Sequence, residues 1–199
     1  MRWRISGINK TNLIPMKTSM KFTSFFAVAL MTAFSAFAQE KTVMVGGAEM
    51  YPSKNIVENA ANSKDHTTLV AAVKAAGLVE TLSGTGPFTV FAPVNAAFDA
   101  LPAGTVDNLL KPENKATLTS VLTYHVIPGK VDSKSVAKMI KDGKGKAMAK
   151  TAQGAELTFS MDGKDLIVTD AKGNKGKVTI ADVYQSNGVI HVIDKVLMP

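Results

Sequence analysis

The chain contains no cysteine, and its arginines stand only at positions 2 and 4. Without cysteine there can be no disulfide framework, so the folded protein must be stabilised by a hydrophobic core. A lipid-modified cysteine is excluded for the same reason. Arginine is the residue best suited to bidentate contacts with phosphate and guanine, and its absence after Arg4 argues against a nucleic-acid partner.

Residues 1–38 have the order of regions that is typical of a secretory signal peptide. Lys17 and Lys21 precede an apolar run over residues 22–34, and small residues follow it. Cleavage is expected after Ala38. The apolar run is shorter than the roughly 20 residues of a membrane-spanning helix, so an uncleaved anchor is the less favoured alternative. We therefore expect a secreted or periplasmic protein without a stable membrane anchor after cleavage.

Most of the positive charge of the chain lies in this leader. The whole chain has 23 Lys+Arg and 16 Asp+Glu, a net charge of +7. Five of the basic residues and none of the acidic ones precede residue 39, so the mature chain carries 18 − 16 = +2. The basic character of the full chain thus gives no support to nucleic-acid binding. The mature chain is long enough for one domain with its own core, and we expect a monomer.

Helical signals dominate the first half of the mature chain. Residues 39–53 contain glycine and proline without apolar periodicity, and we interpret them as a linker or a loosely docked N-terminal arm. Capping residues, apolar spacing and stop signals then predict several short helices. They are expected over residues 55–61, from Asp65 to Gly77, over 78–82, from Asn95 to Leu101, and between Pro112 and Pro128.

Strand signals dominate the second half. Residues 88–92 are apolar on both faces, which is typical of a fully buried strand. Period-2 alternation predicts further strands over residues 157–160, 166–169, 178–181 and 189–197. Helices first and strands mostly later indicate an α+β fold rather than alternating βαβ units.

Three segments carry a family resemblance. They are Gly86–Phe98, Leu122–Val126 and Asn187–Pro199. Together they resemble the hallmark segments of the fasciclin-domain family, extracellular modules used mainly in adhesion and matrix contacts. The resemblance implies a fasciclin-like domain over residues 54–199, in which a central β-sheet wedge is flanked by a cluster of short helices. It also implies that the first and last segments are neighbouring strands.

The sequence departs from the family pattern at one position. The family commonly has a hydroxyl or acidic residue where this chain has Val94. Valine cannot hydrogen-bond a helix start, so Asn95 alone is left to cap the helix that follows.

The pair Tyr124 and His125 is the part of the resemblance with a functional implication. In animal members of the family, a tyrosine–histidine region is implicated in integrin contact, which makes the pair a candidate partner-binding site. The alternative is structural, because His125 shares an apolar helical face with Leu118 and Leu122. A histidine in that position is usually buried and hydrogen-bonded.

A lysine-rich stretch over residues 130–150 is the second candidate site. It has seven lysines against two aspartates, a local net charge of 7 − 2 = +5. One interpretation is an adhesive strip for an anionic polysaccharide, and the other is a solvated connection without a partner. The candidate contact residues are Lys138, Lys141, Lys144 and Lys146.

The chain has few signals of catalytic or metal chemistry. Its three histidines do not pair at the spacing of a helical zinc site, and no cysteine can assist them, so we expect no metal. There is no Gly-x-Ser-x-Gly elbow, and the glycine- and lysine-rich stretch over residues 143–146 lacks the hydroxyl residue of a phosphate loop. We expect no catalytic residues and no cofactor.

The sequence therefore predicts a secreted, non-catalytic binding module that acts in cell-surface or matrix adhesion. The expected partner is a surface protein or an anionic polysaccharide. Two alternatives stay open: an enzyme acting on envelope glycans, which would need a pair of facing carboxylates, and a small-ligand or lipid carrier, which would need a large apolar pocket.

Overall fold

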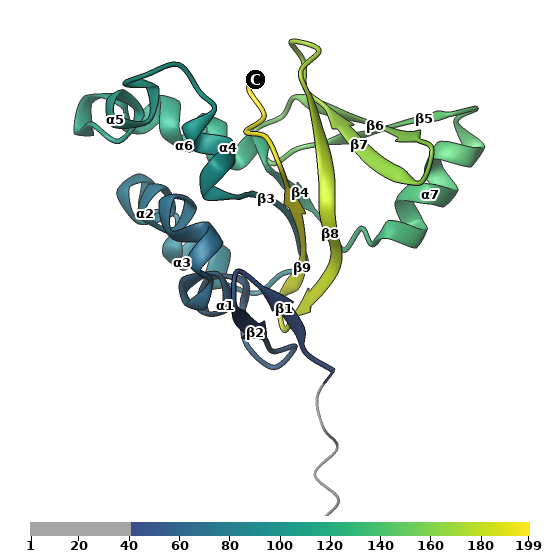
Figure 1. Cartoon of the computed structure of the whole chain (residues 1–199), viewed down its shortest axis with the longest axis horizontal. Coiled ribbons are helices and arrows are strands. Elements are labelled where there is room, and N and C mark those ends of the chain that lie inside the picture. Colours follow the sequence, from purple (N-terminus) through teal and green to yellow (C-terminus); the bar gives the residue numbers. More distant parts are fainter. Residues whose placement is uncertain (1–40) are drawn as a thin grey trace, which may run out of the picture. The chain divides into compact units, whose positions relative to one another are not determined.

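The computed structural model describes residues 41–199. The predicted signal peptide lies outside the described residues. Within them, the strands form a two-stranded hairpin and a seven-stranded mixed sheet, accompanied by several short helices (Figure 1). The predicted α+β class and the fasciclin-like arrangement are confirmed. Among residues 41–199, no helix is both long and apolar enough to cross a membrane.

The large sheet has the strand order β4-β3-β9-β8-β7-β6-β5. Its strands are β3 (Phe88–Pro93), β4 (Val126–Pro128), β5 (Lys146–Lys150), β6 (Glu156–Asp162), β7 (Asp165–Thr169), β8 (Lys175–Gln185) and β9 (Gly188–Ile193). β3 and β9 are neighbours, as the resemblance implied; they pair in parallel, and the other pairs are antiparallel. A Cβ on Gly188 would collide with the carbonyl of Phe88, so glycine permits the close approach at which this pairing begins.

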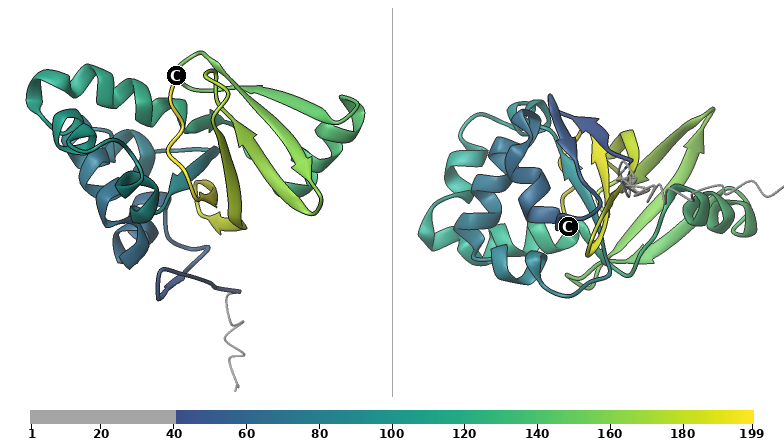
Figure 2. Two further views of the ribbon diagram at one scale, coloured as in Figure 1. Left: turned by 45° about the horizontal axis from the view of Figure 1, so that its top comes forward. Right: turned by 90° about the horizontal axis from the view of Figure 1, so that it is seen from below.

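Six short α-helices gather on one side of β3 and β9, and a seventh packs elsewhere (Figures 1 and 2). The six are α1 (Ile56–Asn62), α2 (Thr67–Ala76), α3 (Val79–Ser83), α4 (Asn95–Asp99), α5 (Thr105–Leu109) and α6 (Lys115–Tyr124). Two 3-10 turns, Lys64–His66 and Pro112–Asn114, lead into α2 and α6. The seventh helix, α7 (Ser133–Asp142), packs against β5 and β6. No helix was predicted at the position of α7, because the stretch was interpreted as a basic strip or solvated connection.

The side chains of β3 and β9 alternate between two cores. Val90 and Ile190 belong to a helix-side core, which also contains buried residues of α1, α2 and α6. Phe91 and Ile193 belong to a strand-side core, which is completed by α7 and strands β5–β8. Period-2 alternation of a strand buried on both faces accounts for this division.

The N-terminal segment corrects one expectation. Residues 41–53 were interpreted as a linker or loosely docked arm, but β1 (Val43–Val45) and β2 (Ala48–Met50) form an antiparallel hairpin. Val45 and Met50 are each 3% exposed and belong to the helix-side core. The hairpin is therefore part of the packed domain, and its brevity explains why no periodicity was seen.

The helix ends follow the predicted signals in part. Asn55 caps α1 in a capping box with Glu58, and Gly77 ends α2 in the left-handed conformation with φ 74°. Asn95 was expected to cap α4, but no side chain caps that helix. Its Oδ1 instead accepts a hydrogen bond from the Thr68 N–H in the first turn of α2, at 3.0 Å. Asn95 thus caps a helix that is distant in sequence.

Candidate functional site

Tyr124 lies inside the molecule at the end of α6. Its side chain is fully buried, and its hydroxyl donates to the Glu156 carbonyl at 3.0 Å and accepts from the Ala171 N–H at 2.9 Å. Burial, the largest cause, raises the pKa of this phenol above its ordinary value. A side chain held in this way is not available for a partner at the surface, so the expectation of a direct contact is corrected.

His125 is equally inaccessible, at 3% exposed. Its Nδ1–H donates to the Val121 carbonyl at 2.8 Å, and its Nε2 accepts from the Leu197 N–H at 2.9 Å. Burial lowers the pKa of His125 to about 4, so the ring is neutral at physiological pH. The alternative interpretation, a buried and hydrogen-bonded histidine, is the one that the structure supports.

The carboxylate of Asp170 completes the attachment of the C-terminal tail. It accepts hydrogen bonds from the Met198 N–H at 3.0 Å and from the Asn174 N–H at 2.8 Å. Next to Met198, the Leu197 N–H donates to His125. Next to Asp170, the Ala171 N–H donates to the Tyr124 hydroxyl. The tyrosine–histidine pair therefore joins α6 to the turn after β7 and to the chain end.

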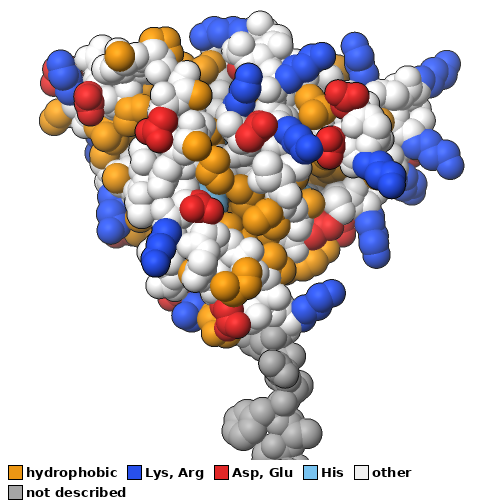
Figure 3. Space-filling view, viewed as in Figure 1, with side chains coloured by type: hydrophobic (Ala, Val, Ile, Leu, Met, Phe, Trp, Pro, Cys, Tyr) orange, Lys and Arg blue, Asp and Glu red, His pale blue; other side chains and the backbone are white. Residues whose placement is uncertain are grey.

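The lysines of the second candidate site are exposed, and they divide between two elements. Lys134, Lys138 and Lys141 lie at helical spacings of four and three on α7, so they form one stripe, which we call the lysine stripe. Val136 and Ile140 point the other way and are buried in the strand-side core. The stripe therefore faces solvent. Figure 3 shows Lys side chains gathered over this part of the molecule.

Lys144 and Lys146 do not belong to the stripe. Lys144 lies in the turn after α7 with a positive φ of 55°. Lys146 begins β5, where the exposed residues Lys146, Met148 and Lys150 alternate with the more buried Ala147 and Ala149. Since α7 packs on the Ala147 side, the β5 lysines project from the other face of the strand.

Two aspartates hold the start of the lysine stripe in place. Asp132 caps α7 by accepting from the Ser135 N–H at 2.8 Å. Asp182, at the irregular part of β8, accepts from the Ser133 N–H at 2.7 Å and from the Ser133 hydroxyl. The stripe is thus carried on a helix whose N-terminus is fixed to the sheet. Sequence reasoning left Lys134 out, although its spacing from Lys138 and Lys141 was a readable signal.

A serine, a histidine and an aspartate meet near this helix start, but they do not form a hydrolytic triad. His191 accepts at Nδ1 from the backbone N–H of Asp182 at 3.3 Å, and its Nε2–H donates to the Val131 carbonyl at 2.9 Å. Burial lowers the pKa of His191. With both ring nitrogens engaged by backbone groups, this histidine has no free nitrogen to activate Ser133. Among residues 41–199, no group of three metal-ligating side chains is placed to hold an ion.

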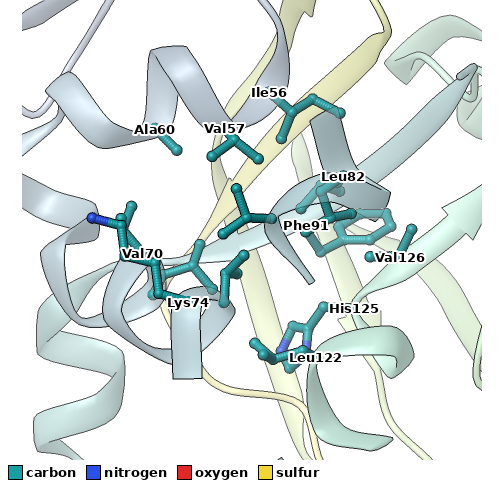
Figure 4. Close-up of a pocket in the computed structure, with 14 residues that line it drawn as sticks. Ile56, Val57, Ala60, Val70, Lys74, Leu82, Phe91, Leu122, His125 and Val126 are labelled. Carbon is teal, nitrogen blue, oxygen red and sulfur yellow. The ribbon is translucent and has the colours of Figure 1, made fainter. Parts of the chain in front are cut away.

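An apolar pocket lies on the helix side of the molecule, and sequence reasoning did not find it. α1, α2 and α3 line it, together with β3, the end of α6 and the start of β4 (Figure 4). About 40 Å³ of the pocket admits a molecule the size of water, and about 520 Å³ is empty when its open mouth is counted. Among its lining residues, Val57, Val70 and Val79 are half-buried, and Lys74 is exposed.

These features define a class: a fasciclin-like α+β module with parallel β3 and β9, a buried tyrosine–histidine pair and a basic helix on its strand side. The Fasciclin domain family model matches residues 64–199, and the chain belongs to this family.

Similar proteins agree with this assignment. The chain is 48% identical over 192 residues to Protein sll1483 of Synechocystis, covering 92% of this chain and 99% of that protein. It is 34% identical over 215 residues to the cell surface glycolipoprotein MPB83 of Mycobacterium bovis, covering 98% of this chain and 89% of the relative. Among solved structures, a FAS1 domain pair from the insect cell adhesion molecule Fasciclin I matches with a TM-score of 0.50 and 21% identity. That match covers 65% of this chain and 43% of the domain pair, and it shows the fold.

Proposed function

We propose that this protein is an exported binding module that acts in adhesion, and that it holds an anionic polysaccharide on the lysine stripe of α7. Membership of the fasciclin-domain family supports an adhesive role. One relative is named a cell surface glycolipoprotein, and the structural neighbour belongs to a cell adhesion molecule.

The observation that carries the choice of partner is the arrangement of α7. Lys134, Lys138 and Lys141 are exposed and lie on one face of a helix whose opposite face is anchored in the core. Asp132 is engaged in capping the same helix. A row of cations on a fixed helix can contact successive anionic groups along a polymer, with attraction that extends over roughly 8 Å at physiological salt.

The environment of two buried histidines favours a binding function over a catalytic one. His125 and His191 are buried, their pKa values are lowered, and both nitrogens of each ring contact backbone atoms. Neither can serve as an acid or base toward an external substrate in this arrangement.

The test compares two variants with the same loss of charge. The mature protein (residues 39–199) is titrated with alginate and heparin, and with dextran as the neutral control, across a salt series. The double variant Lys138→Gln, Lys141→Gln should weaken binding to the anionic polymers on the order of tenfold, because it removes two cations of the stripe. The matched variant Lys146→Gln, Lys150→Gln on β5 should change it little.

If both variants weakened binding equally, the attraction would depend only on the net charge of the protein, and a site on α7 would be contradicted. Binding that persists in high salt or extends to dextran would also contradict it. If no polysaccharide binds but a purified envelope-protein fraction does, the partner is a surface protein instead.

A further inference from the structure

The apolar pocket on the helix side has the chemistry of a ligand site, which the proposed adhesive function leaves unused. Its walls are mostly aliphatic side chains, and its polar lining residues are Lys74 and the neutral ring of His125. His125 is buried and both of its ring nitrogens are engaged, so it presents no free polar group to the pocket. Pockets that are mostly apolar with a few placed polar groups are typical of small-molecule sites.

The small volume of the pocket limits the shape of the ligand that can enter it. An apolar cavity of about 150 Å³ is what holds a benzene ring. Here about 40 Å³ admits a sphere the size of water, which is well below that volume, and about 520 Å³ is empty when the open mouth is counted. An interior this small does not hold a ring system, but it can take the end of one flexible aliphatic chain, whose remaining methylenes would lie over the open mouth.

A lysine at the mouth of the pocket indicates that the ligand carries a negative charge. Lys74 projects from α2 beside Val70, as the labelled side chains of Figure 4 show. Within residues 41–199, the ion pair that forms joins Lys177 to Asp165, and Lys74 takes part in none. A lone cation at the rim of an apolar pocket complements an anionic head group whose tail enters the pocket.

We infer that this pocket binds a free single-chain carboxylic acid of medium length, with its tail between α1, α2 and α3 and its carboxylate at Lys74. The half-buried Val57, Val70 and Val79 gain burial when the chain covers them. The site is independent of the lysine stripe, because α7 packs in the strand-side core and contributes nothing to the pocket.

The first experiment is a calorimetric titration with a series of carboxylates from hexanoate to dodecanoate, below their micellar concentrations. Each further methylene that enters the pocket should tighten binding about fourfold, and the gain should stop once the pocket is filled. In parallel, methyl-labelled protein titrated with decanoate should show resonance shifts at Val57, Val70 and Val79. Shifts that spread to Met44 and Met148, which are exposed elsewhere, would overturn the site.

Variants separate the tail contact from the head contact. Lys74→Gln should weaken decanoate binding about twofold to fivefold and leave decanol unchanged, whereas the control Lys172→Gln, in the turn after β7, should change neither. Val70→Phe should reduce binding by filling the mouth, and the matched change Ile167→Phe on β7 should not.

Three outcomes would sink the inference. They are an affinity that does not depend on chain length, equal effects of the two lysine variants, and binding to phosphatidylglycerol vesicles without binding to free decanoate. The last would mean that the protein adsorbs to a lipid surface and does not take up a chain. Because the methyl shifts are read on the unaltered protein, a variant that fails to fold does not remove the test.

Discussion

The two cores that share β3 and β9 are closed to different degrees. On the strand side, Phe91, Leu157 and Phe159 are fully buried, and α7 covers the sheet from which they project. On the helix side, four of the six short helices, α1, α2, α3 and α6, line the apolar pocket and leave it open between them. Protein interiors are close-packed as a rule, so the strand side follows that rule and the helix side departs from it at the pocket.

The difference separates the two binding sites that we propose. The closed strand side carries its lysines outward on a fixed helix, so the binding proposed there would be electrostatic and at the surface. The open helix side has apolar groups at its mouth, so the binding proposed there would depend on burial. Mutations should therefore affect stability most on the strand side and ligand uptake most on the helix side.

The largest expected effect comes from breaking the closed core. Phe91 is fully buried and packs against Phe159 and His191, with ring centroids 5.5 Å and 5.4 Å away. Phe91→Ala should lower the free energy of unfolding by about 3–5 kcal/mol, because the surrounding sheet cannot collapse into the space. Val70→Ala at the pocket mouth should cost about 1 kcal/mol or less, since this side chain is half-exposed. Urea unfolding monitored by circular dichroism measures both, and similar losses would contradict the comparison.

The next largest effect is a loss of stability in acid. It arises at His125, where the two cores meet, and it tests how far their stabilities are coupled. His125 lines the open pocket and also holds Leu197 of the closed core. Its folded-state pKa of about 4 lies below the ordinary 6.5, so the unfolded chain binds a proton first as the pH falls. The contribution of His125 to the free energy of unfolding is therefore fully present above pH 6.5. It is lost as the pH falls from 6.5 to about 4, and the loss amounts to at most about 3 kcal/mol.

The measurement is the free energy of unfolding at pH 7 and pH 4.5. The lowered pKa values of His66 and His191 act in the same direction, so the wild-type loss contains their contributions too. His125→Asn should be less stable at pH 7 but should lose less on acidification. An equal loss in both proteins would show that His125 does not govern the acid response.

Local patterns predicted much of the fold. The helix at residues 55–61, the stop at Gly77 and the buried strand at 88–92 each depend on neighbouring residues, and the structure has all three within a residue or two. The parallel pairing of β3 with β9 joins segments about a hundred residues apart. The family resemblance, and not any local signal, predicted that these two strands are neighbours, and the structure adds that they are parallel.

The missed elements depend on contacts that sequence neighbours do not make. α7 has two buried apolar residues among its lysines, and its start is fixed by Asp182 on the distant β8. β8 was predicted over residues 178–181 from their alternation, but it runs from Lys175 to Gln185. Asp182, with a positive φ of 59°, lies where the strand pairing is irregular, and the simple alternation does not continue through it. Tyr124 and His125 were recognised as a pair, but their role depended on partners at Ala171 and Leu197.

The smallest expected effect concerns the cap that Asn95 supplies to α2. Its Oδ1 accepts from the Thr68 N–H, and its Nδ2 donates to the Lys64 carbonyl at 2.8 Å, so it ties the end of β3 to the helix side. Asn95→Ala should destabilise the protein by about 1 kcal/mol, as loss of a helix cap usually does. Hydrogen exchange locates the effect: the Thr68 amide should exchange faster, while the Ser135 amide, capped by Asp132 in α7, should keep its protection. Faster exchange at both amides would mean that the two halves open together, and the distinction between an open helix side and a closed strand side would then not extend to their dynamics.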